Sequence, residues 1–84
     1  MAYFTKEDNG DIWYSYYKVC GCIPRDLATK DGLQKYLESD DFQEAVINSY
    51  DGIDLSEGHS KNIRRVFAKM QRTEDWLRQR MSAF

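Results

Sequence analysis

Long apolar runs are missing from this chain, and no secretory leader is recognisable at its start. The longest apolar stretches extend over a few positions only, whereas a membrane-spanning helix needs about 18 apolar residues or more. The first ten residues, MAYFTKEDNG, contain neither a basic segment nor an apolar segment of the kind found in signal peptides. We therefore expect no membrane association and a cytoplasmic location, in a cell or in an infected host.

Cysteine and histidine are scarce, which argues against a disulfide framework and against a structural metal site. The chain has two cysteines, Cys20 and Cys22, and one histidine, His59. Structural zinc sites need four ligands, usually from cysteine pairs spaced C-x₂₋₄-C, and this chain has no second pair. We predict two free thiols, no metal and no cofactor. A zinc site formed by Cys20, Cys22 and His59 with a further ligand from elsewhere is the alternative.

No catalytic signature is present either. The chain has no glycine-rich loop of the kind that binds phosphates. His59 has Ser56 and Ser60 as sequence neighbours, but a nucleophile and a base also require a third group that orients the base, and none can be identified. The sequence therefore predicts no enzyme and no catalytic residues.

The composition is that of one small globular domain. The 84 residues, with 42% hydrophobic and 31% charged side chains, leave room for a single core, so we assign residues 1–84 to one domain. Aromatic residues make up 14% of the chain, which is a large share for so small a core. Some of the tyrosines and tryptophans are therefore expected at the surface.

The N-terminal segment AYFTKEDNGDIWYSYYKV predicts a β-hairpin. Asn9-Gly10 is typical of a two-residue type I′ turn, in which both central residues have positive φ. Pairing Asp8 with Asp11 across this turn would place Lys6 opposite Trp13, Phe4 opposite Ser15 and Tyr3 opposite Tyr16. A helix over residues 11–20, and with it an all-α fold, is the alternative.

The second arm of this hairpin is rich in aromatic residues on both of its faces. Strand alternation places Ile12, Tyr14, Tyr16 and Lys18 on one face and Trp13, Ser15, Tyr17 and Val19 on the other. One face is expected to cover the helices, and the other is too apolar to be left in water. We therefore predict that Trp13, Tyr14 and Tyr16 contribute to a partner-binding surface, with homodimerisation through the hairpin as an alternative.

Three helices are predicted after a loop at CGCIPRDLAT, which has room for a short third strand at its start. Thr29 and Ser39 are expected to cap two short helices, extending to about residue 38 and over about 40–50. Ser56 is expected to cap a long helix that continues to Phe84. The apolar residues that these helices are expected to bury are Leu33, Tyr36 and Leu37, then Phe42, Ala45, Val46, Ile47 and Tyr50, and finally Ile63, Val66, Phe67, Met70, Leu77 and Met81. The predicted fold class is α+β, with an N-terminal antiparallel hairpin or small sheet, two short helices and one long C-terminal helix.

The charges are divided unevenly along the chain. Residues 1–58 carry five basic and twelve acidic side chains, a net −7, whereas residues 59–84 carry seven basic and two acidic ones, a net +5. On a helical wheel of the last helix, Trp76 falls among the basic residues, opposite the apolar stripe. The predicted binding residues on this basic face are Lys61, Arg64, Arg65, Lys69, Arg72 and Trp76. In the alternative, the basic segment packs beside the acidic one and the helix bends near Thr73, which turns Trp76 into the core.

These features favour a non-enzymatic binding protein that inhibits or regulates a macromolecular partner by docking on it. We expect that partner to be a protein in the first place. The small size, the aromatic surface and the divided charge have the general character of inhibitors and accessory proteins of phages and mobile elements. The alternative is an RNA-binding or single-stranded DNA-binding protein that uses the basic C-terminal helix.

Overall fold

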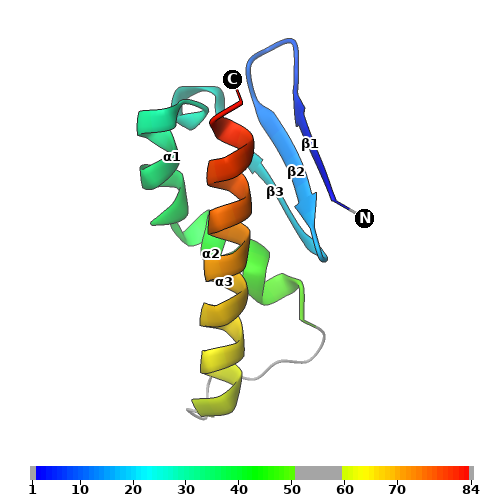
Figure 1. Ribbon diagram of the computed structural model, residues 1–84, viewed down its shortest axis with the longest axis vertical. Coiled ribbons are helices and arrows are strands. Elements are labelled where there is room, and N and C mark those ends of the chain that lie inside the picture. Colours follow the sequence, from blue (N-terminus) through cyan, green and yellow to red (C-terminus); the bar gives the residue numbers. More distant parts are fainter. Residues whose placement is uncertain (1, 51–59, 84) are drawn as a thin grey trace.

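The computed structural model describes residues 2–50 and 60–83 and shows an α+β fold (Figure 1). Strands β1 (Tyr3–Lys6), β2 (Ile12–Tyr16) and β3 (Val19–Ile23) form an antiparallel sheet in the order β1-β2-β3. The helices follow in sequence and lie on one side of this sheet (Figure 1). The predicted fold class is confirmed, and the all-α alternative is excluded because the segment of its proposed helix, residues 11–20, forms strands.

The helices are α1 (Lys30–Leu37), α2 (Asp40–Asn48) and α3 (Ser60–Met81), and a short 3-10 helix (Arg25–Leu27) precedes them. The caps of the first two are as predicted. The Thr29 side chain accepts a hydrogen bond from the Gly32 N–H at 2.8 Å, and the Ser39 hydroxyl accepts one from the Phe42 N–H at 3.4 Å. The predicted cap of α3, Ser56, lies outside the described residues.

The turn between β1 and β2 differs from the predicted one by a single residue. The Gly10 N–H donates to the Glu7 carbonyl at 2.9 Å, and Glu7 and Asp11 close a three-residue loop in which only Gly10, at φ 97°, has positive φ. Asn-Gly fits such a loop as well as a two-residue turn. The extra loop residue shifts the predicted pairing by one position, so the observed partners are Tyr3 and Ser15, Phe4 and Tyr14, Thr5 and Trp13, and Lys6 and Ile12.

The two-residue turn with positive φ lies instead between β2 and β3. Tyr17 has φ 45° and Lys18 has φ 73°, and the strands close on the pair Tyr16 and Val19. This is the backbone of a type I′ turn, in which Asn and Gly are the usual residues. The prediction that β2 continues through Lys18 and Val19 is therefore wrong, and Val19 is buried as the first residue of β3.

The core lies between the inner face of the sheet and the three helices. The expected stripe of α1 is buried in full, and Phe42 and Val46 of α2 are completely buried. Ala45, Ile47 and Tyr50 are half-buried against this core. The fully or almost fully buried apolar residues are Ile12, Tyr14, Val19, Ile23, Ala28, Leu33, Tyr36, Leu37, Phe42, Val46, Val66, Leu77 and Met81.

The long helix buries a slightly different stripe from the predicted one. Val66, Leu77 and Met81 are buried, but Phe67 is 64% exposed. Thr73 is completely buried, and its hydroxyl donates to the Lys69 carbonyl at 2.8 Å within the helix. At about 100° per residue, Phe67 lies about 100° from Val66, which faces the core, and so falls outside the buried stripe. The prediction that Phe67 anchors the core is wrong.

The N-terminal half of α3 extends past the end of the sheet, alongside α2 (Figure 1). The helix is continuous from Ser60 to Met81 and is drawn without a bend along its length (Figure 1), so the bend proposed near Thr73 does not occur. One exposed face of this half of α3 therefore lies between the turn that joins β2 to β3 and the C-terminal end of α2.

Candidate binding site

The aromatic residues of β2 are divided between the core and the outer face of the sheet. Tyr14 is completely buried, and its hydroxyl lies 2.6 Å from that of Tyr36. The prediction that Tyr14 belongs to a partner-binding surface is therefore wrong, because no partner can reach it. Trp13, on the opposite face, is 46% exposed, and Tyr3, on the same outer face, is 51% exposed.

Tyr16 and Trp76 join the sheet to α3. Their rings are stacked, with centroids 4.9 Å apart and an interplanar angle of 28°. Trp76 also makes an edge contact with Phe4 at 5.9 Å, and the Arg80 guanidinium lies 5.6 Å from its ring centroid. Trp76 is thus half-buried against the sheet without any bend of the helix, and it is not the open stacking platform that the helical wheel suggested.

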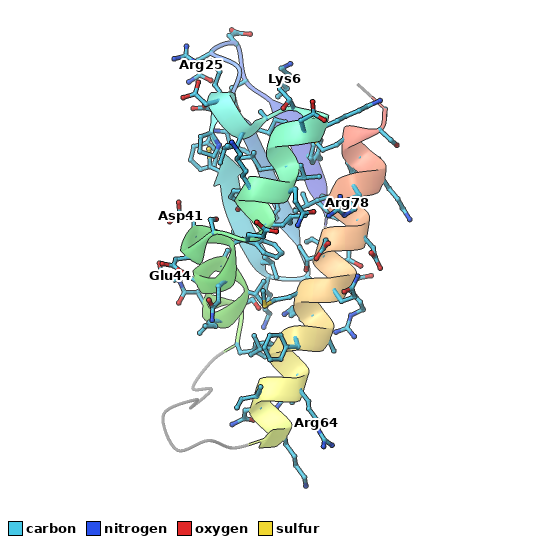
Figure 2. The ribbon with its side chains drawn as sticks, turned by 90° about the vertical axis from the view of Figure 1, so that its left-hand side faces the viewer. Lys6, Arg25, Asp41, Glu44, Arg64 and Arg78 are labelled. Atoms are coloured by element: carbon cyan, nitrogen blue, oxygen red, sulfur yellow. The ribbon has the colours of Figure 1, made fainter. Side chains whose placement is uncertain are left out.

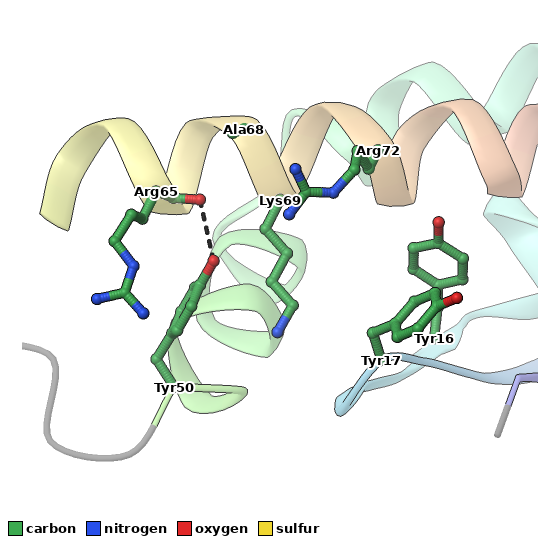
Figure 3. Close-up of a pocket in the computed structure, with 7 residues that line it drawn as sticks. All are labelled: Tyr16, Tyr17, Tyr50, Arg65, Ala68, Lys69 and Arg72. Carbon is green, nitrogen blue, oxygen red and sulfur yellow. Dashed lines mark hydrogen bonds between the residues drawn. The ribbon is translucent and has the colours of Figure 1, made fainter. Parts of the chain in front are cut away.

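Beside this stack, a groove with a volume of about 670 Å³ lies between three elements. One side is the turn between β2 and β3, the other is the C-terminal end of α2, and α3 forms the floor (Figure 3). We call it the tyrosine–cation groove. Its lining consists of Tyr16, Tyr17, Tyr50, Arg65, Ala68, Lys69 and Arg72.

Tyr50 holds two of the cations in place. Its hydroxyl donates to the Arg65 carbonyl at 3.0 Å, which ties the end of α2 to α3 (Figure 3). The Lys69 ammonium lies 4.4 Å from the centroid of the Tyr50 ring, and the Arg65 guanidinium lies 5.2 Å from it. Such cation–π contacts attract the two charges to the ring face. They also cover the ring.

The positive charges of the groove repel one another. The pKa of Lys69 is lowered from its usual value of 10.5, first by partial burial and then by the charges of Lys18, Arg72 and Arg65. Lys18 comes from the turn between β2 and β3, so cations approach the groove from its floor and from one of its sides. Partial burial weakens the screening of these charges by water.

No described carboxylate forms a salt bridge with the three cations on the floor of the groove. Within residues 2–50 and 60–83, Arg65, Lys69 and Arg72 form no salt bridge, whereas Arg78, farther along α3, pairs with Glu74 at 3.0 Å. Two acidic residues of α2, Asp41 and Glu44, point away from α3 (Figure 2). The arrangement is therefore suited to binding an anion from outside the described part of the chain.

Three of the predicted basic residues meet in this groove, and two do not. Arg65, Lys69 and Arg72 line it. Lys61 and Arg64 are exposed in the first turns of α3, and Arg64 points into solvent at the far end of the helix (Figure 2). The sequence analysis missed Tyr17, Tyr50, Lys18 and Ala68, because the pattern within each segment does not show that two distant segments meet on α3.

The cysteines lie on the outer face of the sheet. Cys20 is exposed, with its sulfur 3.5 Å from the Ser15 hydroxyl, and Cys22 is half-buried. Burial raises the pKa of the Cys22 thiol, and the negative charges of Asp11 and Glu7 raise it further. Among the residues that the structure describes, no three His, Cys, Asp or Glu side chains are grouped to hold a metal ion, and His59 lies outside them.

Comparison of the chain with protein-family models, with curated proteins and with solved structures finds no match. In the described part of the chain, none of the helices has the length and apolar character needed to span a membrane. The groove must therefore be interpreted from its own chemistry.

Proposed function

We propose that the protein is a small non-enzymatic binding protein that inhibits or regulates a macromolecular partner by docking on it through the tyrosine–cation groove. The observation that carries the proposal is the grouping of Arg65, Lys69 and Arg72 around one hollow, without a salt bridge to any described carboxylate. Like charges held this close lower the stability of the fold. An anionic partner would offset that cost.

The other side chains of the groove also suit recognition. Tyrosine and arginine are the residue types that dominate binding energy at protein interfaces, because they combine a large contact area with hydrogen-bonding groups. Tyr17 is 70% exposed at the edge of the groove, so its ring and hydroxyl are accessible to a partner. A function as a docking protein agrees with the general character of small phage and mobile-element inhibitors and with the expected cytoplasmic location.

The charge distribution supports a local anion site on an otherwise acidic molecule. The net charge is −2 and the isoelectric point about 5.3, yet the groove collects cations from α3 and from the turn beside it. A partner with a negatively charged patch would be attracted more strongly to the groove than to the rest of this acidic molecule, which favours one orientation of docking.

The test compares two variants with the same change in net charge. In the groove variant, Arg65→Gln, Lys69→Gln and Arg72→Gln are combined. In the control variant, Arg25→Gln, Lys30→Gln and Lys35→Gln remove three exposed cations from other elements. We expect the wild type and the control to be retained on a polyanionic heparin resin, and the groove variant to elute at clearly lower salt.

Stability of the same variants distinguishes an external anion from an internal one. With an external partner, the groove variant should lose no more than the roughly 1–2 kcal/mol that its two cation–π contacts with Tyr50 supply, as measured by urea unfolding, because removal of the repulsion offsets part of that loss. A clearly larger loss of stability would show that the acidic half of the chain neutralises these cations, and equal elution of both variants would show that the groove has no special affinity for anions. Either result contradicts the proposal.

A further inference from the structure

The three cations on the floor of the groove are spaced along α3 at distances close to those between alternate side chains of an extended peptide. Arg72 lies seven positions after Arg65 on α3, with Lys69 between them, so the three cations extend over about 10 Å at about 1.5 Å per residue. Successive cations are thus about 6 Å and 4.5 Å apart along the helix. In an extended peptide, alternate side chains lie on the same face about 6.6 Å apart. Long, flexible Arg and Lys side chains can accommodate the small difference.

The centre of the floor is open to a peptide backbone. Ala68 lines the groove between the three cations and contributes only a methyl group there. Tyr50 forms one side and Tyr17 the other (Figure 3). A segment of five extended residues presents three alternate side chains over about 13 Å, which long Arg and Lys side chains can match, and it needs no folded structure of its own.

The aromatic rings favour a peptide over a nucleic acid. Proteins that bind single strands stack successive bases on exposed aromatic faces. Here the ring of Tyr50 is covered by Lys69 and Arg65, and the ring of Tyr16 is stacked on Trp76. Tyr17 is the one ring of the described groove lining that is largely exposed. Cations are therefore present for phosphates, but platforms for a series of bases are not.

The overall charge supports the same choice. Nucleic-acid-binding domains usually have a high isoelectric point and a basic surface that extends along the strand. This chain has a net charge of −2, and its cationic groove is only about 10 Å long, which corresponds to a few phosphates at most. A short acidic segment of a protein needs neither a strongly basic domain nor a long basic surface, so it fits this groove better than a nucleic acid does.

From this geometry we infer that the groove binds an extended acidic segment of a partner protein, with carboxylates at alternate positions facing Arg65, Lys69 and Arg72 and the intervening backbone over Ala68. This inference rests on the proposed docking function and adds the chemical class of the partner. Lys18 and the Tyr17 hydroxyl, on the side of the turn, supply a further charge and a further hydrogen-bonding group for the same segment.

The inference can be tested with two labelled probes and the full-length protein. The first probe is a fluorescent peptide with four Glu alternating with Ser, and the second is an oligothymidylate of the same charge. Fluorescence anisotropy at low salt should show binding of the peptide that is tighter than binding of the oligothymidylate. A peptide of the same composition with the four Glu in one block should bind about two- to fivefold more weakly for each carboxylate that no longer faces a cation.

Three variants define the site. The groove variant with three Gln substitutions should weaken peptide binding by roughly 10- to 100-fold, from the loss of three charge pairs. The Ala68→Glu variant should abolish binding while increasing thermal stability, since it places a carboxylate within the same cations, four residues before Arg72. The control variant with Gln at positions 25, 30 and 35 should bind as the wild type does.

The outcomes separate the inference from the function on which it rests. Tighter, groove-dependent binding of oligothymidylate would overturn the acidic-peptide inference and leave the groove as a docking site for nucleic acid. Peptide binding that the Ala68→Glu and groove variants do not change would also overturn the inference, because the peptide would bind elsewhere. A loss of stability in the groove variant that clearly exceeds the loss of its two cation–π contacts with Tyr50 would contradict both the inference and the proposed function.

Discussion

The hydroxyl oxygens of Tyr14 and Tyr36 lie 2.6 Å apart in the core, where each is the hydrogen-bond partner of the other. The rings meet edge to face, with centroids 6.2 Å apart. This pair joins β2 to α1 and places two polar groups in an apolar environment. Burial of such groups is tolerated when they are hydrogen-bonded and costly when they are not.

We expect a strong coupling between these two hydroxyls. Tyr36→Phe should lower the free energy of unfolding by about 1–3 kcal/mol, because it leaves the buried Tyr14 hydroxyl without a partner. Tyr14→Phe should have a similar effect. The double variant should lose clearly less than the sum of the two, since both polar groups are then absent. Additive losses in urea unfolding would show that each hydroxyl has another partner.

Gly21 is part of the same prediction because it lies against the two hydroxyls. A Cβ atom at Gly21 would lie 2.6 Å from the Tyr14 oxygen and 2.8 Å from the Tyr36 oxygen. Gly21→Ala should therefore cost about 1–3 kcal/mol, as overpacking of a core usually does. The cost should shrink in the variant with Phe at positions 14 and 36, which lacks the two oxygens. The Tyr14 ring carbon Cζ, 2.8 Å from the added Cβ, remains in that variant, so part of the cost should persist; an equal cost in both backgrounds would show that the two oxygens contribute nothing to it.

Alkaline pH should destabilise the protein through the same pair. Burial raises the pKa of Tyr36 to about 12 and raises that of Tyr14 well above its usual value of 10.0. Above pH 10 the unfolded chain loses these protons while the folded chain keeps them, so the free energy of unfolding falls as the pH rises from about 10 through 12.

Urea midpoints at pH 9, 10 and 11 measure this effect. The wild type should lose stability across the series more steeply than the variant with Phe at both positions. Lys69 acts in the opposite direction. Its pKa is lowered in the folded state, so the folded chain loses this proton before the unfolded chain does, and the charge repulsion in the groove falls as the pH approaches 10.5. Since Lys69 is present in both proteins, the difference between their slopes reports the tyrosines alone. Equal slopes would contradict the prediction.

Truncation should cost much more stability at Trp76 than at Phe67. Trp76 packs against Tyr16, Phe4 and Tyr14, so Trp76→Ala should cost about 2–4 kcal/mol, somewhat less than for a fully buried aromatic. Phe67 is 64% exposed, and Phe67→Ala should change the stability by less than about 1 kcal/mol. Thermal unfolding followed by circular dichroism measures both. A core-like loss for Phe67→Ala would show that its ring is covered in solution.

Much of the fold follows from local patterns in the sequence. The aromatic strand, the caps Thr29 and Ser39 and the stripe of α1 were predictable because each depends on residues within a few positions. The register of the first hairpin was not, because Asn9-Gly10 is compatible with loops of two and of three residues. Strand β3 was underestimated because Gly21 suggests a break in a strand, whereas here it makes room for the tyrosine pair.

The candidate site was predictable only in part, because some of its residues come from segments that are distant in the sequence. The periodicity of α3 placed Arg65, Lys69 and Arg72 together on one face of the helix. Tyr17 and Tyr50 reach the same groove from distant segments, and that meeting depends on tertiary packing. The helical wheel also placed Trp76 among the cations, but its large ring extends from the edge of that face to the sheet, where it stacks on Tyr16.

The turn between β2 and β3 combines a cost in stability with a position at the groove. Tyr17 and Lys18 both adopt positive φ, which costs a residue with a side chain about 1–2 kcal/mol relative to glycine. Residues with such strained backbone conformations are often found at functional sites, where the function of the side chain outweighs the cost of the strain.

Replacing this turn with Asn-Gly should therefore separate stability from binding. The double variant Tyr17→Asn, Lys18→Gly has the residues that a type I′ turn prefers, and we expect it to gain about 1–2 kcal/mol, even though it loses the edge contact of Tyr17 with Tyr16. It should bind the acidic peptide more weakly, because the groove loses a cation and an exposed phenol. Urea unfolding and anisotropy on the same samples measure the two effects. If the variant is more stable and binds as the wild type does, the turn takes no part in recognition. If it is less stable, the side chains of Tyr17 and Lys18 support the fold more than their backbone strains it.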